Sequence, residues 1–228
     1  MGILSTGQFW MAAFLTAAAA YLIGSVSFAV IISRLCAQDD VRAHGSGNAG
    51  MTNILRTYGK KLAFLTALGD FGKGVVAVAL GRIIFRLVAD TTLPVPFDGG
   101  YIAGLFVILG HVFPLYFHFK GGKGVLASLG VLMMLNPLVF SIIVILMVPF
   151  VFWVKIVSLA SVIGFLIFPV LTTVVNLVSS RPYQFDLFFS LLISAMGIWM
   201  HRTNIKRLLN GTEYRFGTKK ATEQKTEQ

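Results

Sequence analysis

The sequence predicts an all-α, polytopic membrane protein. Apolar residues make up 56% of the 228 residues and charged residues only 12%, whereas an ordinary soluble domain has about 45–50% apolar and ~25% charged residues. The apolar residues also form long stretches without Asp, Glu, Lys or Arg, as helices surrounded by lipid do. This composition excludes a disordered chain, a soluble enzyme and a nucleic-acid-binding domain, despite the formal net charge of +10.

The expected helices follow from these stretches, because a spanning helix needs about 20 mostly apolar residues. In chain order they are 9–33, a weaker span at 62–88, then 99–119, 124–135, 138–154, 156–180 and 187–201. The weaker span contains Asp70 and Lys73, which we interpret as a structural ion pair because residues three apart are neighbours on a helix.

The division at residue 136 decides the number of spans. Residues 124–154 form one run of 31 residues without a charged side chain. As a single helix the run would be ~46 Å long at 1.5 Å per residue, against a hydrocarbon core of ~30 Å. Asn136-Pro137 favours a turn, so we expect a short helix and a full one. The protein then has seven transmembrane helices, one of them short.

The basic residues predict the orientation, because Lys and Arg collect on the cytoplasmic side of a membrane. With seven spans, only Arg82, Arg86 and Arg181 lie opposite the other basic residues. We therefore expect the N-terminus outside and the C-terminus in the cytoplasm. Residues 1–216 are predicted to form a single membrane domain, and 217–228 a disordered polar cytoplasmic tail.

The first polar cluster lies between the first two spans. Its members are Gly45, Ser46, Gly47, Asn48, Gly50, Thr52, Asn53 and Arg56. The glycines let the backbone approach a ligand closely, and the arginine offers a two-pronged donor for phosphate. The cluster matches G-x-G-x-x-G, but no strand precedes it, so we reject a dinucleotide site. A plain flexible turn would not need the added amides, hydroxyls and arginine.

The second cluster closes the third span. Lys120 and Lys123 stand in a glycine-rich turn that leads into the short helix. Ammonium groups and a helix N-terminus together favour an anion, although Lys120, nearer the interface, is alternatively a membrane anchor. His111 lies deeper in the span, and we favour a functional role for it because ionisable residues there usually face the interior of the bundle.

Two further clusters begin the sixth span and end the seventh. Ser158 and Ser161 share one helix face, and His201 and Asn204 share another. Taken alone, the serines are typical of helix packing in membranes. The four clusters together contain almost no carboxylate, so they predict an anion site, for phosphate, and no metal. The single cysteine, Cys36, excludes an internal disulfide.

In order and spacing, these motifs closely resemble the bacterial PlsY family of membrane-integral acyl-phosphate:glycerol-3-phosphate acyltransferases. The matching segments are Gly45 to Arg56, Gly110 to Val125, Ser158 to Ser161 and His201 to Glu213. The resemblance covers about residues 9–216. It implies a seven-helix enzyme of the bacterial inner membrane that uses acyl phosphate to make lysophosphatidic acid, without metal or cofactor. Whether a soluble acyl-phosphate synthase docks on it stays open.

The resemblance also implies roles for the residues. Ser46 and His111 are the catalytic candidates, and the substrate-binding candidates are Gly45, Gly47, Asn48, Thr52, Asn53, Arg56, Lys120, Lys123, Ser158, Ser161, His201 and Asn204. We expect Lys123, Arg56, His201 and Asn204 at the glycerol phosphate. Ser46, the glycine-rich backbone, Ser158 and Ser161 are expected at the acyl phosphate.

Two questions stay open at this point. The general base is either His111 or a phosphate oxygen of the substrate, and we favour the phosphate because the sequence reveals no His–carboxylate pair. The rival function is a transporter or exchanger of organophosphate anions. We place it second, because the polar clusters lie at one face and the other face has no matching set.

Overall fold

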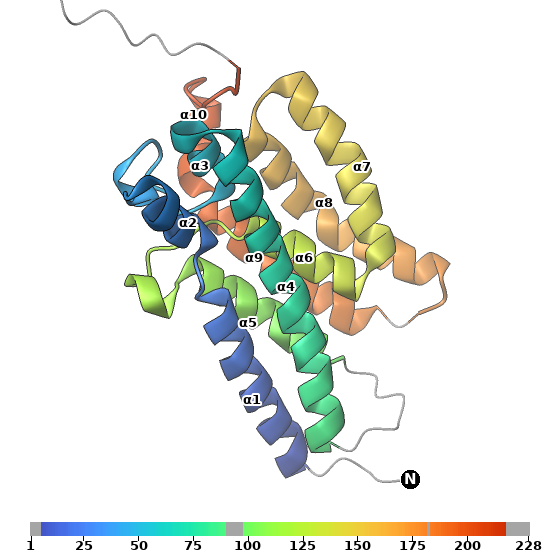
Figure 1. Cartoon of the computed structure of the whole chain (residues 1–228). Coiled ribbons are helices and arrows are strands. Elements are labelled where there is room, and N and C mark those ends of the chain that lie inside the picture. Colours follow the sequence, from blue (N-terminus) through green and yellow to red (C-terminus); the bar gives the residue numbers. More distant parts are fainter. Residues whose placement is uncertain (1–5, 90–97, 182, 218–228) are drawn as a thin grey trace, which may run out of the picture.

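The computed structural model describes residues 6–89, 98–181 and 183–217, and within these ranges the regular structure is entirely helical. The predicted tail at 217–228 therefore lies outside the described residues, except for Gly217. Figure 1 shows long helices packed along one another, with the short helices α2, α3 and α10 gathered at one end.

The first predicted span is broken into two helices. Helix α1 covers Thr6–Gly24 and α2 covers Phe28–Ala37. In the break, the Ser25 hydroxyl donates to the Tyr21 carbonyl at 2.8 Å and accepts the Leu115 amide at 3.1 Å. The predicted span over 9–33 lies within one apolar segment, Gly7–Ala37, that is long enough to cross a membrane. Its helix is interrupted, because these serine and backbone bonds give the chain an alternative to the helix.

The next elements lead from the end with the short helices into the bundle. A short turn at Val41–Ala43 (η1) leads to α3, Met51–Tyr58, and then to the long helix α4, Lys60–Ala89. Small residues let α4 pack closely on α6: a Cβ at Gly74 would lie 2.5 Å from the Ala127 carbonyl oxygen. The predicted ion pair inside α4 is confirmed, with Lys73 Nζ 2.9 Å from Asp70 Oδ1.

The third predicted span corresponds to the apolar segment Gly100–Phe117, but its regular helix ends earlier than expected. Helix α5 covers Gly100–Val112 and is followed by a short turn, Leu115–Phe117 (η2). Pro114 ends the regular helix, because proline cannot donate the next backbone hydrogen bond. His118 therefore lies outside α5, in the left-handed conformation, and its side chain is exposed.

The predicted division of the 31-residue run is confirmed. Helix α6 covers Val125–Leu135 and α7 covers Pro137–Val154. Asn136 caps α7 by accepting the Val139 amide at 3.2 Å, and Pro137 occupies the first helical turn, where a missing N–H costs nothing. The Asn136-Pro137 dipeptide therefore both makes the turn and caps the helix that follows.

The chain continues through α8, Val157–Val178, α9, Gln184–Met200, and α10, Arg202–Leu209. Four segments of the described chain are long and apolar enough to cross a membrane: Gly7–Ala37, Gly100–Phe117, Pro137–Val154 and Val157–Val178. Only 11% of α7 is buried against 50% of the α5 segment. Helix α7 thus presents most of its apolar surface outward, as a lipid-facing helix does.

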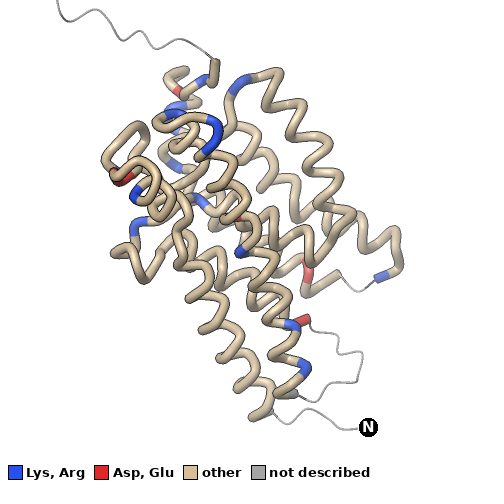
Figure 2. Tube along the Cα trace, viewed as in Figure 1, with Lys and Arg blue, Asp and Glu red and all other residues tan. Residues whose placement is uncertain are grey.

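Charged residues are distributed unevenly along the bundle. Figure 2 shows most Lys and Arg at the end that carries α2, α3 and α10, with few at the opposite end, where α1 begins. At that opposite end, Arg82 pairs with Asp98 at 2.6 Å.

Candidate active site

A cavity of about 420 Å³ opens beside α6, α7 and α8, and its lining includes Arg56, Lys123, Lys155 and Arg207. Its polar end is lined by Ser46, Asn48, Thr52, Asn53, Arg56, Asp70, His111, Lys123, Ser158, Ser161, His201, Asn204, Arg207 and Glu213. The remainder is an apolar groove lined by Leu126, Leu129, Leu132, Ile143, Val144, Met147, Val148, Val151, Gly164, Phe165 and Phe168. The cavity therefore joins a polar site to a hydrophobic channel without interruption.

The glycine-rich loop at the polar end is organised by Asn53. The Asn53 amide donates to the Val41 carbonyl at 3.0 Å and to the His44 carbonyl at 2.9 Å, and its oxygen accepts the Ser46 amide at 3.0 Å. Gly45 and Gly47 adopt positive φ angles of 58° and 69°, which favour glycine. These two glycines shape the loop but do not line the cavity, whereas Ser46 does.

The loop before α6 packs against the first loop. The Ala49 amide donates to the Gly121 carbonyl at 3.4 Å, and a Cβ at Gly122 would lie 2.6 Å from the Ala49 carbonyl oxygen. Only glycine fits this close approach, which explains why the predicted turn is glycine-rich. Two clusters separated by two predicted spans in the sequence thus form one continuous surface.

Lys123 projects from this second loop into the cavity, where its ammonium group donates to Asn204 Oδ1. Burial lowers the pKa of the Lys123 ammonium to about 8, because desolvation disfavours the charged form. Lys120, three residues earlier, has an exposed side chain and does not line the cavity. The structure therefore separates the two predicted lysines: it brings Lys123 into the site and leaves Lys120 outside.

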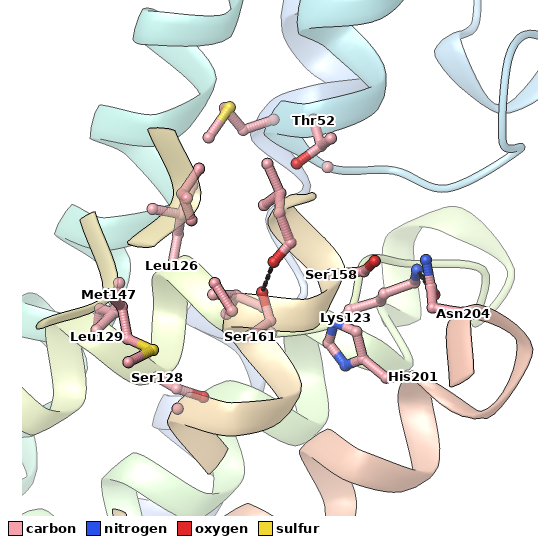
Figure 3. Close-up of a pocket in the computed structure, with 18 of the residues that line it drawn as sticks. Thr52, Lys123, Leu126, Ser128, Leu129, Met147, Ser158, Ser161, His201 and Asn204 are labelled. Atoms are coloured by element: carbon pink, nitrogen blue, oxygen red, sulfur yellow. Dashed lines mark hydrogen bonds between the residues drawn. The ribbon is translucent and has the colours of Figure 1, made fainter. Parts of the chain in front are cut away.

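Asn204 and His201 come from the end of α9 and the start of α10. His201 is 2% exposed, and its Nδ1 lies 2.7 Å from the Gly197 carbonyl oxygen. With Nδ1 donating to that carbonyl, the neutral tautomer of the ring offers Nε2 as an acceptor. Figure 3 shows Lys123, His201 and Asn204 side by side, next to Ser158.

The polar end contains the carboxylate of Glu213, although the sequence analysis expected almost no carboxylate there. Glu213 Oε1 accepts from the Ser158 hydroxyl at 2.8 Å and from the Asn204 amide at 2.7 Å, and its Oε2 accepts from Arg207 Nε at 2.7 Å. Burial would raise the pKa of the Glu213 carboxyl, but the hydrogen bonds from Arg207, Asn204 and Ser158 outweigh it and hold that pKa below its ordinary value. The expectation of a site nearly free of carboxylates was wrong.

The segment that carries Glu213 also covers the arginine of the first cluster. The Arg56 guanidinium lies 3.8 Å from the centre of the Tyr214 ring, a cation–π geometry. Two residues later, the Phe216 amide donates to the Lys155 carbonyl at 2.9 Å. The C-terminal segment 211–217 is thereby fixed across the polar end of the cavity.

The remaining candidates are Ser161 and His111. The Ser161 hydroxyl lines the cavity but donates to the Val157 carbonyl at 3.0 Å, within its own helix (Figure 3). His111 lines it as well, and its Nδ1 lies 3.4 Å from Asp70 Oδ1. A His–carboxylate pair is therefore present although the sequence revealed none, because its members come from different helices and are 41 residues apart.

Sequence reasoning missed the roles of four residues at this site. Arg207, Glu213 and Tyr214 line the cavity, and Asp70 is the partner of His111. Glu213 and Arg207 belong to the quoted C-terminal motif, so the signal was present, but their partners are set by the tertiary fold. Within the described residues, no group of three or more His, Cys, Asp and Glu side chains is placed to hold a metal ion.

The fold and the site define a class of protein: a helical membrane protein with a basic pocket that is framed by glycine-rich loops and opens into an apolar groove. A family model described as glycerol-3-phosphate acyltransferase matches residues 14–211. The chain belongs to this family.

Relatives and solved structures agree with this assignment. The chain is 41% identical over 204 residues to a glycerol-3-phosphate acyltransferase of Clostridioides difficile, covering 90% of this chain and 95% of the relative. A protein of the same name from Neisseria meningitidis is 38% identical, with coverage of 89% and 96%.

Two crystal structures of PlsY, described as an integral membrane glycerol 3-phosphate acyltransferase, share the fold. The glycerol 3-phosphate form has a TM-score of 0.78 at 35% identity, and the lysophosphatidic acid form has a TM-score of 0.75 at 34% identity. Each comparison covers 90% of this chain and 96% of the PlsY chain. The resemblance inferred from the motifs is confirmed.

Proposed function

We propose that the protein is a glycerol-3-phosphate acyltransferase that transfers a fatty acyl group from acyl phosphate to glycerol 3-phosphate, forming lysophosphatidic acid and phosphate. One observation carries the proposal: a single cavity joins a basic polar end to an apolar groove. A phosphate fits the first and an acyl chain the second, so the reacting carbonyl lies at their junction.

The polar end offers groups for two phosphates. Lys123 and Arg56 supply positive charge, and His201 and Asn204 supply neutral hydrogen-bonding groups for the glycerol phosphate. Ser46, Asn48 and Thr52 in the first loop and Ser158 and Ser161 on α8 face the same space and are assigned to the acyl phosphate. The supporting residues Gly45, Gly47 and Asn53 shape the first loop, and Lys120 is a peripheral anchor.

The chemistry needs alignment more than activation, because acyl phosphate is a mixed anhydride with a good leaving group. A hydroxyl of glycerol 3-phosphate attacks the acyl carbonyl carbon and forms the ester bond. The bond between that carbon and the phosphate oxygen breaks, and a phosphate oxygen takes the hydroxyl proton. The protein contributes by holding both substrates together and by stabilising the developing charge. No step in this scheme requires a metal or a cofactor.

The proposal includes a membrane arrangement. The helices α1–α2, α4, α5, α6, α7, α8 and α9 correspond to the seven predicted spans, and the basic end is assigned to the cytoplasm of a bacterial inner membrane. The N-terminus is then outside, and a soluble acyl-phosphate synthase could deliver substrate from the cytoplasm. Reporter fusions at Gly47, Gly122 and Thr218 should report cytoplasm, and one at Asp98 should report the outside. A periplasmic signal at Thr218 would refute this arrangement.

The decisive test of the activity uses protein purified in detergent, with glycerol 3-phosphate and a long-chain acyl phosphate. We expect lysophosphatidic acid without any sealed vesicle, and no product when acyl-CoA replaces acyl phosphate. Equal turnover with both donors would refute the donor assignment. Glycerol 3-phosphate uptake into vesicles without product would support the transporter, which the one-sided polar cavity disfavours.

A further inference from the structure

The inner wall of the polar end contains a buried charged cluster for which the proposed reaction has no direct use. Asp70 and Lys73 on α4 and His111 on α5 have side chains that are 2%, 3% and 6% exposed. Asp70 Oδ1 is the shared centre, 2.9 Å from Lys73 Nζ and 3.4 Å from His111 Nδ1. A buried ion pair adds little net stability, so it needs another explanation, such as fixing one arrangement of the chain.

The cluster contacts non-helical backbone at two places, through Lys73 and through His111. Lys73 Nζ donates to the Val26 carbonyl at 2.7 Å, in the break between α1 and α2. At the other end, the His111 carbonyl accepts the Gly122 amide at 3.1 Å, and a Cβ at Gly122 would overlap His111 Nε2. The imidazole thus lies directly against the backbone of the residue that precedes Lys123.

The orientation of the ring favours a supporting role. Nδ1 lies toward the Asp70 carboxylate and Nε2 lies against Gly122, so both ring nitrogens are next to protein atoms. A general base needs one nitrogen within reach of the substrate hydroxyl. A support needs a ring fixed on one side and in contact with the loop on the other, and this is the geometry found here.

We propose that Asp70, Lys73 and His111 form a positioning cluster for Lys123. Asp70, held by Lys73, orients the imidazole, and the imidazole with its own backbone carbonyl fixes the turn at Gly122, so that the Lys123 ammonium meets the glycerol phosphate. His111 is then not the proton acceptor of the reaction. This inference rests on the proposed function and deepens it.

The test compares three variants by the binding of glycerol 3-phosphate, measured by calorimetry, and by KM, kcat and the pH profile of kcat. His111→Ala should raise Kd and KM for glycerol 3-phosphate roughly tenfold, change kcat much less, and leave the pH profile in place. His111→Asn should restore most of the affinity, because its amide can donate to Asp70 from the position of Nδ1. Asp70→Asn/Lys73→Met, which removes both charges together and leaves neither unpaired, should weaken binding like His111→Ala.

His118→Asn is the matched control, since His118 is exposed, lies in the same loop and is in the left-handed conformation that Asn tolerates. It should leave every parameter unchanged. A His111→Ala variant with lower kcat, unchanged KM and a lost pH limb would overturn the proposal in favour of a base, and unchanged kinetics would overturn it outright. If His111→Ala fails to insert, His111→Asn and the double variant decide alone. A wild-type protein that binds glycerol 3-phosphate but forms no product would refute the proposed function and leave the binding test valid.

Discussion

The two halves of the cavity are built in different ways. The apolar groove comes mainly from three helices that follow one another in the chain, α6, α7 and α8. The polar end combines loops and helix ends from residues 46 to 213, and it depends on close contacts such as Ala49 with Gly121 and Glu213 with Ser158. Hydrophobic burial in the groove is non-directional, whereas the hydrogen bonds of the polar end weaken steeply when their geometry changes. Changes at the polar end should therefore cost far more than changes in the groove.

The largest loss should follow Lys123→Ala. This change removes the half-buried ammonium group that faces the cavity, and a charge-assisted hydrogen bond is worth about 1.5–3 kcal/mol, or roughly ten- to a hundredfold in binding or turnover. The measurement is kcat/KM at limiting glycerol 3-phosphate with folded, inserted protein. Lys120→Ala is the matched control and should lose much less, because its side chain is exposed outside the cavity. Equal and mild losses from both changes would mean that the two lysines serve only membrane topology.

The second effect is a pH dependence of the polar end. The pKa of the Lys123 ammonium is lowered to about 8 by burial, so the charged form that binds phosphate predominates below this pH and is lost above it. The KM for glycerol 3-phosphate should rise as pH increases, by roughly tenfold one unit above the pKa. Lys123→Arg should flatten the rise, because a guanidinium stays charged. A KM that is constant from pH 7 to 9.5 in the wild type would contradict the assignment.

A smaller loss should follow Glu213→Gln. The amide keeps one oxygen for Ser158 and Asn204 but places an NH₂ group opposite Arg207, so one hydrogen bond is lost. The expected fall in kcat/KM is about three- to tenfold. Arg207→Ala should lose less, since that side chain is 42% exposed. A larger fall in kcat/KM for Arg207→Ala than for Glu213→Gln would mean that the Glu213 carboxylate does not hold the hydrogen bonds of the polar end together.

The smallest change should come from filling the groove with Gly164→Leu. A Cβ at Gly164 meets only Met147 Cγ, at 3.9 Å, so the new side chain occupies groove space without a backbone clash. Replacing a helical glycine also adds about 1 kcal/mol of helix propensity. We expect an unchanged or higher Tm, a several-fold preference for shorter acyl phosphates and an unaltered KM for glycerol 3-phosphate. Gly72→Leu on α4, outside the cavity, is the control and should not shift chain-length preference.

The same contrast explains what the sequence could predict. Local sequence patterns predict helices. The break at Asn136 could be predicted because the dipeptide Asn136-Pro137 supplies both the cap and the turn. The break at Ser25 was not readable, because the Leu115 amide that satisfies the serine lies 90 residues away. For the site, residue types and spacing were enough to identify an anion pocket.

The partners within the site were beyond local patterns. Lys120 and Lys123 stand in the same glycine-rich turn, and of the two only Lys123 lines the cavity. The close contact of Gly122 with His111 beside it joins two segments that local patterns do not connect. Glu213 was visible in its motif, but its hydrogen bonds to Ser158 and Arg207 depend on where two chain segments meet. Asp70 reads as half of an ion pair within one helix, and its second contact, with His111, requires a neighbouring helix.

The position of Glu213 late in the chain has a consequence for the timing of synthesis. Ser46 and Lys123 are made and inserted long before Glu213, which bonds to Ser158 and Asn204. Until the segment 211–217 leaves the ribosome, Ser158 and Asn204 lack their shared carboxylate and Arg56 lacks the Tyr214 ring. The helices α6, α7 and α8 of the groove precede this segment in the chain, so the polar end is the part of the cavity that is completed last.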